Sequence, residues 1–139
     1  MAIIGSEKIE KNMEKATKNY GKELILDLHD CNVKRFKRPV IRRFFRELCN
    51  LIDMKRCELF WWDDYGVPTE ERQTKPHLKG ISAVQFIMTS NITIHTLDLL
   101  GSVYLNVFSC KNFDVRKVAI FSRKYFEGKV ISATTIVRK

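Results

Sequence analysis

Three successive runs of apolar and β-branched residues between positions 81 and 108 restrict what this chain can fold into. Residues 81–89 are apolar and partly β-branched. In residues 92–96 and 103–108, side chains suited to a buried core alternate with side chains suited to the opposite face of a strand. Alternation with a period of two is the pattern of a β-strand with one buried face. The three runs therefore predict adjacent strands of one sheet.

Two amphipathic segments predict helices that flank these strands in the sequence. Pro39 suits the first turn of a helix, and apolar residues recur at steps of three and four over residues 39–53. Arginines fill many of the positions between them. A second helix is predicted over residues 114–126, with Gly128 at its end. The apolar positions of the first helix are Ile41, Phe44, Phe45, Leu48, Leu51 and Ile52.

Three further strands complete the predicted order of elements. They cover residues 23–29, 57–62 and 130–137. The resulting order is β-α-β-β-β-β-α-β. It predicts an α+β fold, a two-layer α/β sandwich in which a mainly antiparallel sheet carries two helices on one face.

Length and composition predict a single domain with a polar extension. The chain has 139 residues, of which 45% are hydrophobic, and this is enough for one core. Residues 1–20 are polar and rich in Lys and Glu, so we expect a flexible N-terminal tail before one domain over residues 21–139. Because the sequence lacks a long apolar run and a secretion signal, we expect no membrane span and a cytoplasmic protein.

The formal net charge of +9 raises the alternative of a nucleic-acid-binding module. Much of this charge lies in residues 34–46, where Phe36, Phe44 and Phe45 are interleaved with Lys and Arg. The helical spacing, however, places Phe44 and Phe45 on a buried face and the cations on a solvated face. Zinc-finger and helix-turn-helix signatures are missing, so we do not expect nucleic acid to be the partner. The four cysteines have no CxxC spacing, and we expect no metal site.

A serine, a histidine and a cysteine lie at or near the ends of the central strands: Ser90, His95 and Cys110. A serine hydroxyl can attack the carbonyl before it and turn the amide into an ester. Loss of the α-proton then releases the upstream chain and leaves dehydroalanine, which hydrolyses to a pyruvoyl group. A regular strand would place Ser90 and His95 on opposite faces, so we expect Ser90 to lie in the preceding turn. Spacing alone also fits a turn serine, a packed histidine and a packed cysteine.

Residues 89–96 read Thr-Ser-Asn-Ile-Thr-Ile-His-Thr, and residues 106–110 read Asn-Val-Phe-Ser-Cys. Together they resemble the self-cleavage region of the prokaryotic S-adenosylmethionine decarboxylases. Residues 80–83, Gly-Ile-Ser-Ala, stand where that family has Gly-Val-Ser-Gly, and residues 27–31 resemble a further family pattern. The resemblance spans about residues 21–139 and is specific in its central segment.

The resemblance implies a pyruvoyl-dependent decarboxylase of polyamine biosynthesis that cuts itself between Thr89 and Ser90. Ser90 would become the pyruvoyl cofactor, whose carbonyl forms a Schiff base with a substrate amine. His95 and Ser82 would assist processing, and Cys110 would be the proton donor. The resemblance also implies a small amino-acid-type substrate and a homodimer with active sites near the subunit interface.

Two departures from the family pattern concern substrate binding. Leu99 stands where the family has a Glu that holds the ribose hydroxyls, and the loop over residues 75–79 has no aromatic residue to stack on adenine. We therefore expect weaker binding of S-adenosylmethionine, with ornithine or arginine as the alternative substrate. Asp98, or else Asp63 or Asp64, would pair with the cation of such a substrate. For Asp63 and Asp64, solvated acids in a loop are the more common case. An uncleaved, non-catalytic family member is a further alternative.

Overall fold

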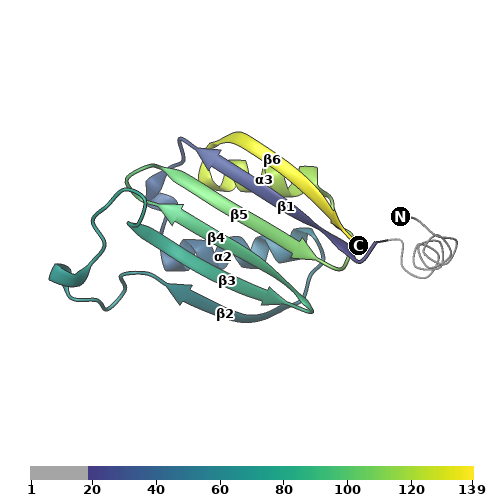
Figure 1. Ribbon diagram of the computed structural model, residues 1–139, viewed down its shortest axis with the longest axis horizontal. Helices are drawn as coiled ribbons and strands as arrows, with labels where there is room; N and C mark the ends of the chain where they lie inside the picture. The colour runs from purple at the N-terminus through teal and green to yellow at the C-terminus, as the bar shows by residue number, and fades with distance from the viewer. Residues whose placement is uncertain (1–18) are drawn as a thin grey trace, which may run out of the picture.

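The computed structural model describes residues 19–139, and nearly all of the tail predicted over residues 1–20 lies outside them. The described chain forms a six-stranded sheet with the order β2-β3-β4-β5-β1-β6, in which all neighbours are antiparallel. Both helices lie on one face of this sheet (Figure 1), so the predicted two-layer α+β sandwich is confirmed. The elements are β1 (Gly21–His29), η1 (Val33–Arg35), α2 (Arg38–Leu51), β2 (Arg56–Trp62), η2 (Thr69–Glu71), β3 (Gly80–Ile87), β4 (Ser90–Leu97), β5 (Ser102–Ser109), α3 (Val115–Phe126) and β6 (Lys129–Arg138).

The core lies between the sheet and the two helices. Alternate residues of β1 are fully buried leucines, as a period of two requires: Leu24, Leu26 and Leu28. On α2, Phe44 is fully buried, and its ring centroid lies 5.7 Å from that of Phe121 and 4.8 Å from that of Phe126. These ring contacts hold α2 and α3 side by side on the sheet.

The end of α3 differs from the expectation. Glu127, not Gly128, adopts the left-handed conformation, with φ of 55°. A Cβ at Gly128 would lie 2.5 Å from Cys31 Sγ and 3.0 Å from the carbonyl oxygen of His29, so the thiol would have to move to admit a side chain. Within residues 19–139, neither helix is long and apolar enough to cross a membrane.

Two arginines in the middle of α2 lie on its solvent side. Both Arg42 and Arg43 are exposed. The guanidinium of Arg42 lies 5.5 Å from the Trp61 ring, and Arg43 Nε donates a hydrogen bond of 3.2 Å to the Tyr125 hydroxyl. Exposed contacts of this kind contribute little to stability, because water and salt screen them.

We therefore expect the double variant Arg42→Gln/Arg43→Gln to keep the wild-type fold and activity. Circular dichroism, thermal unfolding and turnover measure the effect. Phe44→Ala in the same helix is the contrasting variant, because it removes a buried ring and should cost about 3–5 kcal/mol of stability. A large loss of activity in the folded arginine variant would identify this side of α2 as a binding surface instead.

In the part of the chain that the structure describes, no helix covers the other face of the sheet (Figure 1). Ser82 and His95 face this open side, because they alternate with the buried residues Ala83 and Ile94. Large exposed aromatic residues share it: Phe60, Trp62 and Phe86. The open face is therefore less polar than a sheet surface that contacts only solvent usually is.

Candidate active site

Ser90 and Cys110 come together at one end of the sheet. Ser90 is the first residue of β4 and pairs with Ile87 across the hairpin that joins β3 to β4. Cys110 directly follows β5, which is the neighbour of β4. The backbone N–H of Cys110 donates a hydrogen bond of 3.0 Å to Ser90 Oγ, and Ser90 Oγ lies 3.8 Å from Cys110 Sγ. The hydroxyl and the thiol singled out by the sequence are therefore in contact, and we call them the serine–cysteine pair.

The position of Ser90 differs from the expectation. Its side chain is only 6% exposed and shares the helix-facing side of β4 with Ile92. Ser90 thus begins the regular strand, and the expectation that it lies in the turn is wrong. Met88 and Thr89 form the turn instead, both of them exposed, and Thr89 has φ of 58°. The peptide bond between Thr89 and Ser90 joins an exposed turn to a buried strand residue.

A glycine allows β1 to approach Cys110 closely. A Cβ on Gly21 would overlap the carbonyl oxygen of Ser109 and would lie 2.7 Å from Cys110 Cα. Only glycine therefore fits at this point of the sheet. A hollow of about 220 Å³ opens beside Cys110, lined by Asn19, Tyr20, Gly21, Lys22, Cys110, Asn112 and Val137. Sequence reasoning missed Gly21 and Lys22, because their place depends on the pairing of β1 with β5.

His95 and Ser82 form a second pair, on the open face of the sheet. They lie opposite each other on β4 and β3, and His95 Nδ1 is 2.8 Å from Ser82 Oγ. We call them the serine–histidine pair. A hollow of about 220 Å³ adjoins them and includes Phe60 and Trp62 of β2. Sequence reasoning missed these aromatic residues: alternation along β2 puts them on one face, but only the strand order puts that face beside His95.

Within one chain, the side chains of His95 and Ser90 lie far apart. The two side chains point to opposite faces of β4. Five residues of strand also separate them by roughly 17 Å along the sheet. The serine–cysteine pair and the serine–histidine pair are therefore two separate side-chain clusters of the same chain.

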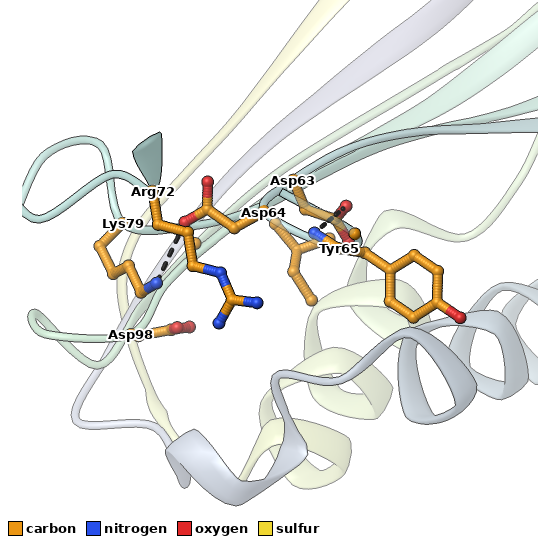
Figure 2. Close-up of a pocket in the computed structure, with 9 residues that line it drawn as sticks. Asp63, Asp64, Tyr65, Arg72, Lys79 and Asp98 are labelled. Carbon is orange, nitrogen blue, oxygen red and sulfur yellow. Dashed lines mark hydrogen bonds and ion pairs between the residues drawn. The ribbon is translucent and has the colours of Figure 1, made fainter. Parts of the chain in front are cut away.

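A charged pocket lies beyond the ends of β3 and β4 that are remote from Ser90 (Figure 2). Its volume is about 400 Å³. Three carboxylates and two cationic side chains are among the residues that line it, and Figure 2 shows Lys79 between Asp64 and Asp98. The residues that line it are Asp63, Asp64, Tyr65, Gly66, Arg72, Lys79, Gly80, Ile81 and Asp98.

Two of these carboxylates are held in ion pairs rather than solvated. Arg38 donates two hydrogen bonds of 2.7 Å to Asp63, and they hold the pKa of Asp63 below its usual range. Lys79 Nζ lies 3.0 Å from Asp64 Oδ2. Asp63 and Asp64 already have cationic partners, so a ligand would have to compete for them.

Asp98 is the third carboxylate of the pocket, and it lacks a hydrogen-bond donor among the described residues. Its Oδ1 is buried and accepts no hydrogen bond from residues 19–139. Burial raises the pKa of Asp98, the Lys79 ammonium acts against this, and the Asp64 carboxylate acts with it. A buried carboxylate oxygen without a donor is costly, so a ligand that brings a cation or hydroxyl would be stabilised here. Leu99 is 61% exposed and is not among the lining residues. Despite the three carboxylates, no group of side chains within the described residues is arranged to hold a metal ion.

The described residues form an α+β sandwich, with the serine–cysteine pair beside the β3–β4 hairpin at one end of its sheet. Residues 22–139 match the family model described as S-adenosylmethionine decarboxylase, and the chain belongs to that family of decarboxylases. The crystal structure of the adenosylmethionine decarboxylase from Aquifex aeolicus VF5 superposes with a TM-score of 0.68 at 17% identity, covering 88% of this chain and 92% of that chain. At this identity the likeness shows the shared fold. No curated protein sequence matches the chain.

Proposed function

We propose that this chain is a pyruvoyl-dependent decarboxylase of polyamine biosynthesis that forms its cofactor from Ser90. The observation that carries the proposal is the contact of Ser90 Oγ with Cys110, directly after the exposed turn that ends at Thr89. S-adenosylmethionine, after which the family is named, is the first candidate substrate.

The residues around Ser90 suit the formation of a pyruvoyl group. The hydroxyl is adjacent to the carbonyl of Thr89, which it must attack to convert the amide into an ester. The backbone N–H of Cys110 orients Ser90 Oγ and can stabilise negative charge on it. When present, a pyruvoyl group supplies the electron sink for loss of carbon dioxide. The new N-terminus at residue 90 would then lie beside the thiol of Cys110.

Intact-mass analysis of the denatured protein tests the self-cleavage. We expect two chains, residues 1–89 and residues 90–139, with a blocked N-terminus on the smaller one. Release of carbon dioxide from S-adenosylmethionine tests the activity. One intact chain without activity would favour a non-catalytic family member.

We expect Cys110→Ala to allow self-cleavage but to lower turnover by about 100-fold or more, the size of a general-acid contribution. Cleavage survives because the hydrogen bond to Ser90 Oγ comes from the backbone N–H of Cys110 and not from its side chain. Turnover falls because the thiol is lost as proton donor to the substrate carbon that held the carboxylate. Mass spectrometry and single-turnover kinetics separate the two effects.

Cys57→Ala is the matched control for this variant, because Cys57 is also an exposed free thiol but lies on β2, at the far edge of the sheet order. It should behave as the wild type. Full turnover in a cleaved Cys110→Ala protein would remove Cys110 from the mechanism.

A homodimer is part of the proposal. The serine–histidine pair lies on the open face and cannot reach Ser90 of its own chain, so His95 and Ser82 can assist processing only across an interface. The exposed residues Phe60 and Trp62 support burial of this face against a second copy. Since Ser90 Oγ faces the helix layer, a two-fold axis that reverses the strand direction would bring the serine–histidine pair of one chain toward the exposed turn of the other that ends at Thr89, beside the bond to be cut.

A second candidate substrate is a basic amino acid, ornithine or arginine. The observation that favours it is the buried, unpaired Oδ1 of Asp98 in the charged pocket. Asp98 of the same chain lies eight strand residues, roughly 26 Å, from Ser90. In the proposed homodimer, the distal cation of such a substrate would instead form a charge-assisted hydrogen bond with the partner subunit's Asp98. Leu99 offers no acceptor to ribose hydroxyls, whereas an aliphatic chain can pass it without cost.

A further inference from the structure

We propose that Thr89 stores backbone strain in the hairpin and that this strain accelerates cleavage of the bond to Ser90. This inference rests on the proposed self-cleavage and names the residue that promotes it. Thr89 has φ of 58°, in the left-handed region. A β-branched residue is a genuine outlier there, because its branched Cβ crowds the backbone.

Thr89 is the least suited of the described residues that adopt this conformation. The other non-glycine residues with positive φ are Asp30, Asp53 and Glu127. Aspartate tolerates the left-handed region well. Glu127 occupies the end of α3, where its backbone N–H reaches the carbonyl oxygens of Arg123 and Lys124. Thr89 alone of the four is β-branched, and it immediately precedes the bond that the chain is proposed to cut.

The strand pairing on both sides of the turn holds this conformation in place. Ile87 ends β3, Ser90 begins β4, and the two residues pair directly, so Met88 and Thr89 must close the hairpin. Met88 has no positive φ. The hairpin closes only because Thr89 takes the left-handed conformation that glycine or asparagine usually supplies in a two-residue turn.

The acyl shift releases this constraint. Ser90 Oγ bonds to the carbonyl carbon of Thr89, the bond from that carbon to the Ser90 nitrogen breaks, and the hydroxyl proton passes to the freed amine. The link between the two residues then runs through Oγ and Cβ of Ser90 instead of through its nitrogen and is one atom longer. Thr89 can relax its φ in the ester but not in the amide. Strain present before the step and absent after it lowers the barrier.

The size of the effect follows from the cost of the left-handed conformation for a residue with a Cβ. If all of this strain is released in the transition state, the rate of self-cleavage changes by roughly tenfold. We therefore expect Thr89→Gly to slow self-cleavage by about tenfold. Thr89→Asn, which tolerates the left-handed region, should slow it by a smaller factor.

Met88→Gly is the matched control. It loosens the same turn by removing a side chain, but it does not relieve a residue with positive φ. It should cleave at nearly the wild-type rate. The measurement is the fraction of intact chain against time after synthesis in a cell-free system, read by denaturing mass spectrometry.

A second readout separates strain from simple loosening. In the uncleavable Ser90→Ala background, Thr89→Gly should raise the midpoint of thermal unfolding, because it removes strain from the intact hairpin. A lower midpoint would mean that glycine only loosens the turn, and it would overturn the proposal. So would a Thr89→Gly chain that cleaves as fast as a cleaving wild type. A wild-type chain that never cleaves would overturn the proposed self-cleavage itself, and this inference with it.

Discussion

Replacement of Ser90 by alanine is expected to abolish self-cleavage and to leave one chain of 139 residues. Alanine removes the only atom of residue 90 that can attack the carbonyl of Thr89. The fold should survive, because Ser90 Oγ accepts one backbone hydrogen bond from Cys110, and losing such a bond costs about 1–3 kcal/mol. Denaturing mass spectrometry shows the chain length, and circular dichroism shows the fold.

Ser132→Ala is the control for this experiment, since Ser132 is an exposed serine on β6. It should leave two fragments as in the wild type. Cleavage in Ser90→Ala, or a wild-type cut at another bond, would overturn the assignment of Ser90.

A mixture of variants then tests whether the serine–histidine pair of one chain assists cleavage at Ser90 of the other. His95→Ala keeps Ser90 but lacks the histidine, and Ser90→Ala keeps the histidine but lacks the nucleophile. If one copy processes its partner, co-expression should restore cleavage of the His95→Ala chain, which each variant alone lacks or performs slowly. Cleavage of His95→Ala at the full rate on its own would remove His95 from processing.

The fold could be predicted because each element carries its own periodic signal. Residues 92–96 and 103–108 alternate as strands, and residues 39–53 have the spacing of a helix. Element ends were harder, because they depend on backbone conformation rather than on burial. The strand predicted over residues 81–89 ends at Ile87, since Met88 and Thr89 form a turn.

The geometry of the candidate site could be predicted only in part. The sequence picks out Ser90, His95 and Cys110, but it does not say which of them touch. The contact of Ser90 with Cys110 depends on β4 and β5 being neighbours, and the separation from His95 depends on Ser90 joining the regular strand. Asp98 has no signal that distinguishes it from an ordinary turn acid. Its Oδ1 has no hydrogen-bond donor among the described residues, because the ammonium of Lys79 pairs with Asp64 instead.

Leu99 leads to the expectation that this protein uses S-adenosylmethionine less efficiently than family members with a complete ribose clamp. Leu99 is exposed and cannot accept a hydrogen bond from a ribose hydroxyl through its side chain. A basic amino acid carries a distal cation that can meet the partner subunit's Asp98 across the proposed interface. We therefore expect measurable kcat/KM for ornithine or arginine beside a low value for S-adenosylmethionine.

Two variants test this substrate preference in opposite directions. Leu99→Glu restores a carboxylate for the ribose and should raise kcat/KM for S-adenosylmethionine by roughly tenfold, the effect of one hydrogen bond to a charged group. Asp98→Asn keeps the size of the side chain but removes its charge, and it should lower kcat/KM for a basic amino acid by about 10–100-fold. Asp64→Asn is the control within the same pocket, because Asp64 already has Lys79 as its cationic partner. The expected preference for a basic amino acid would be contradicted by three results together. These are efficient use of S-adenosylmethionine by the wild type, no gain from Leu99→Glu, and no activity on ornithine or arginine. S-adenosylmethionine would then be the substrate, and the buried oxygen of Asp98 would need another donor.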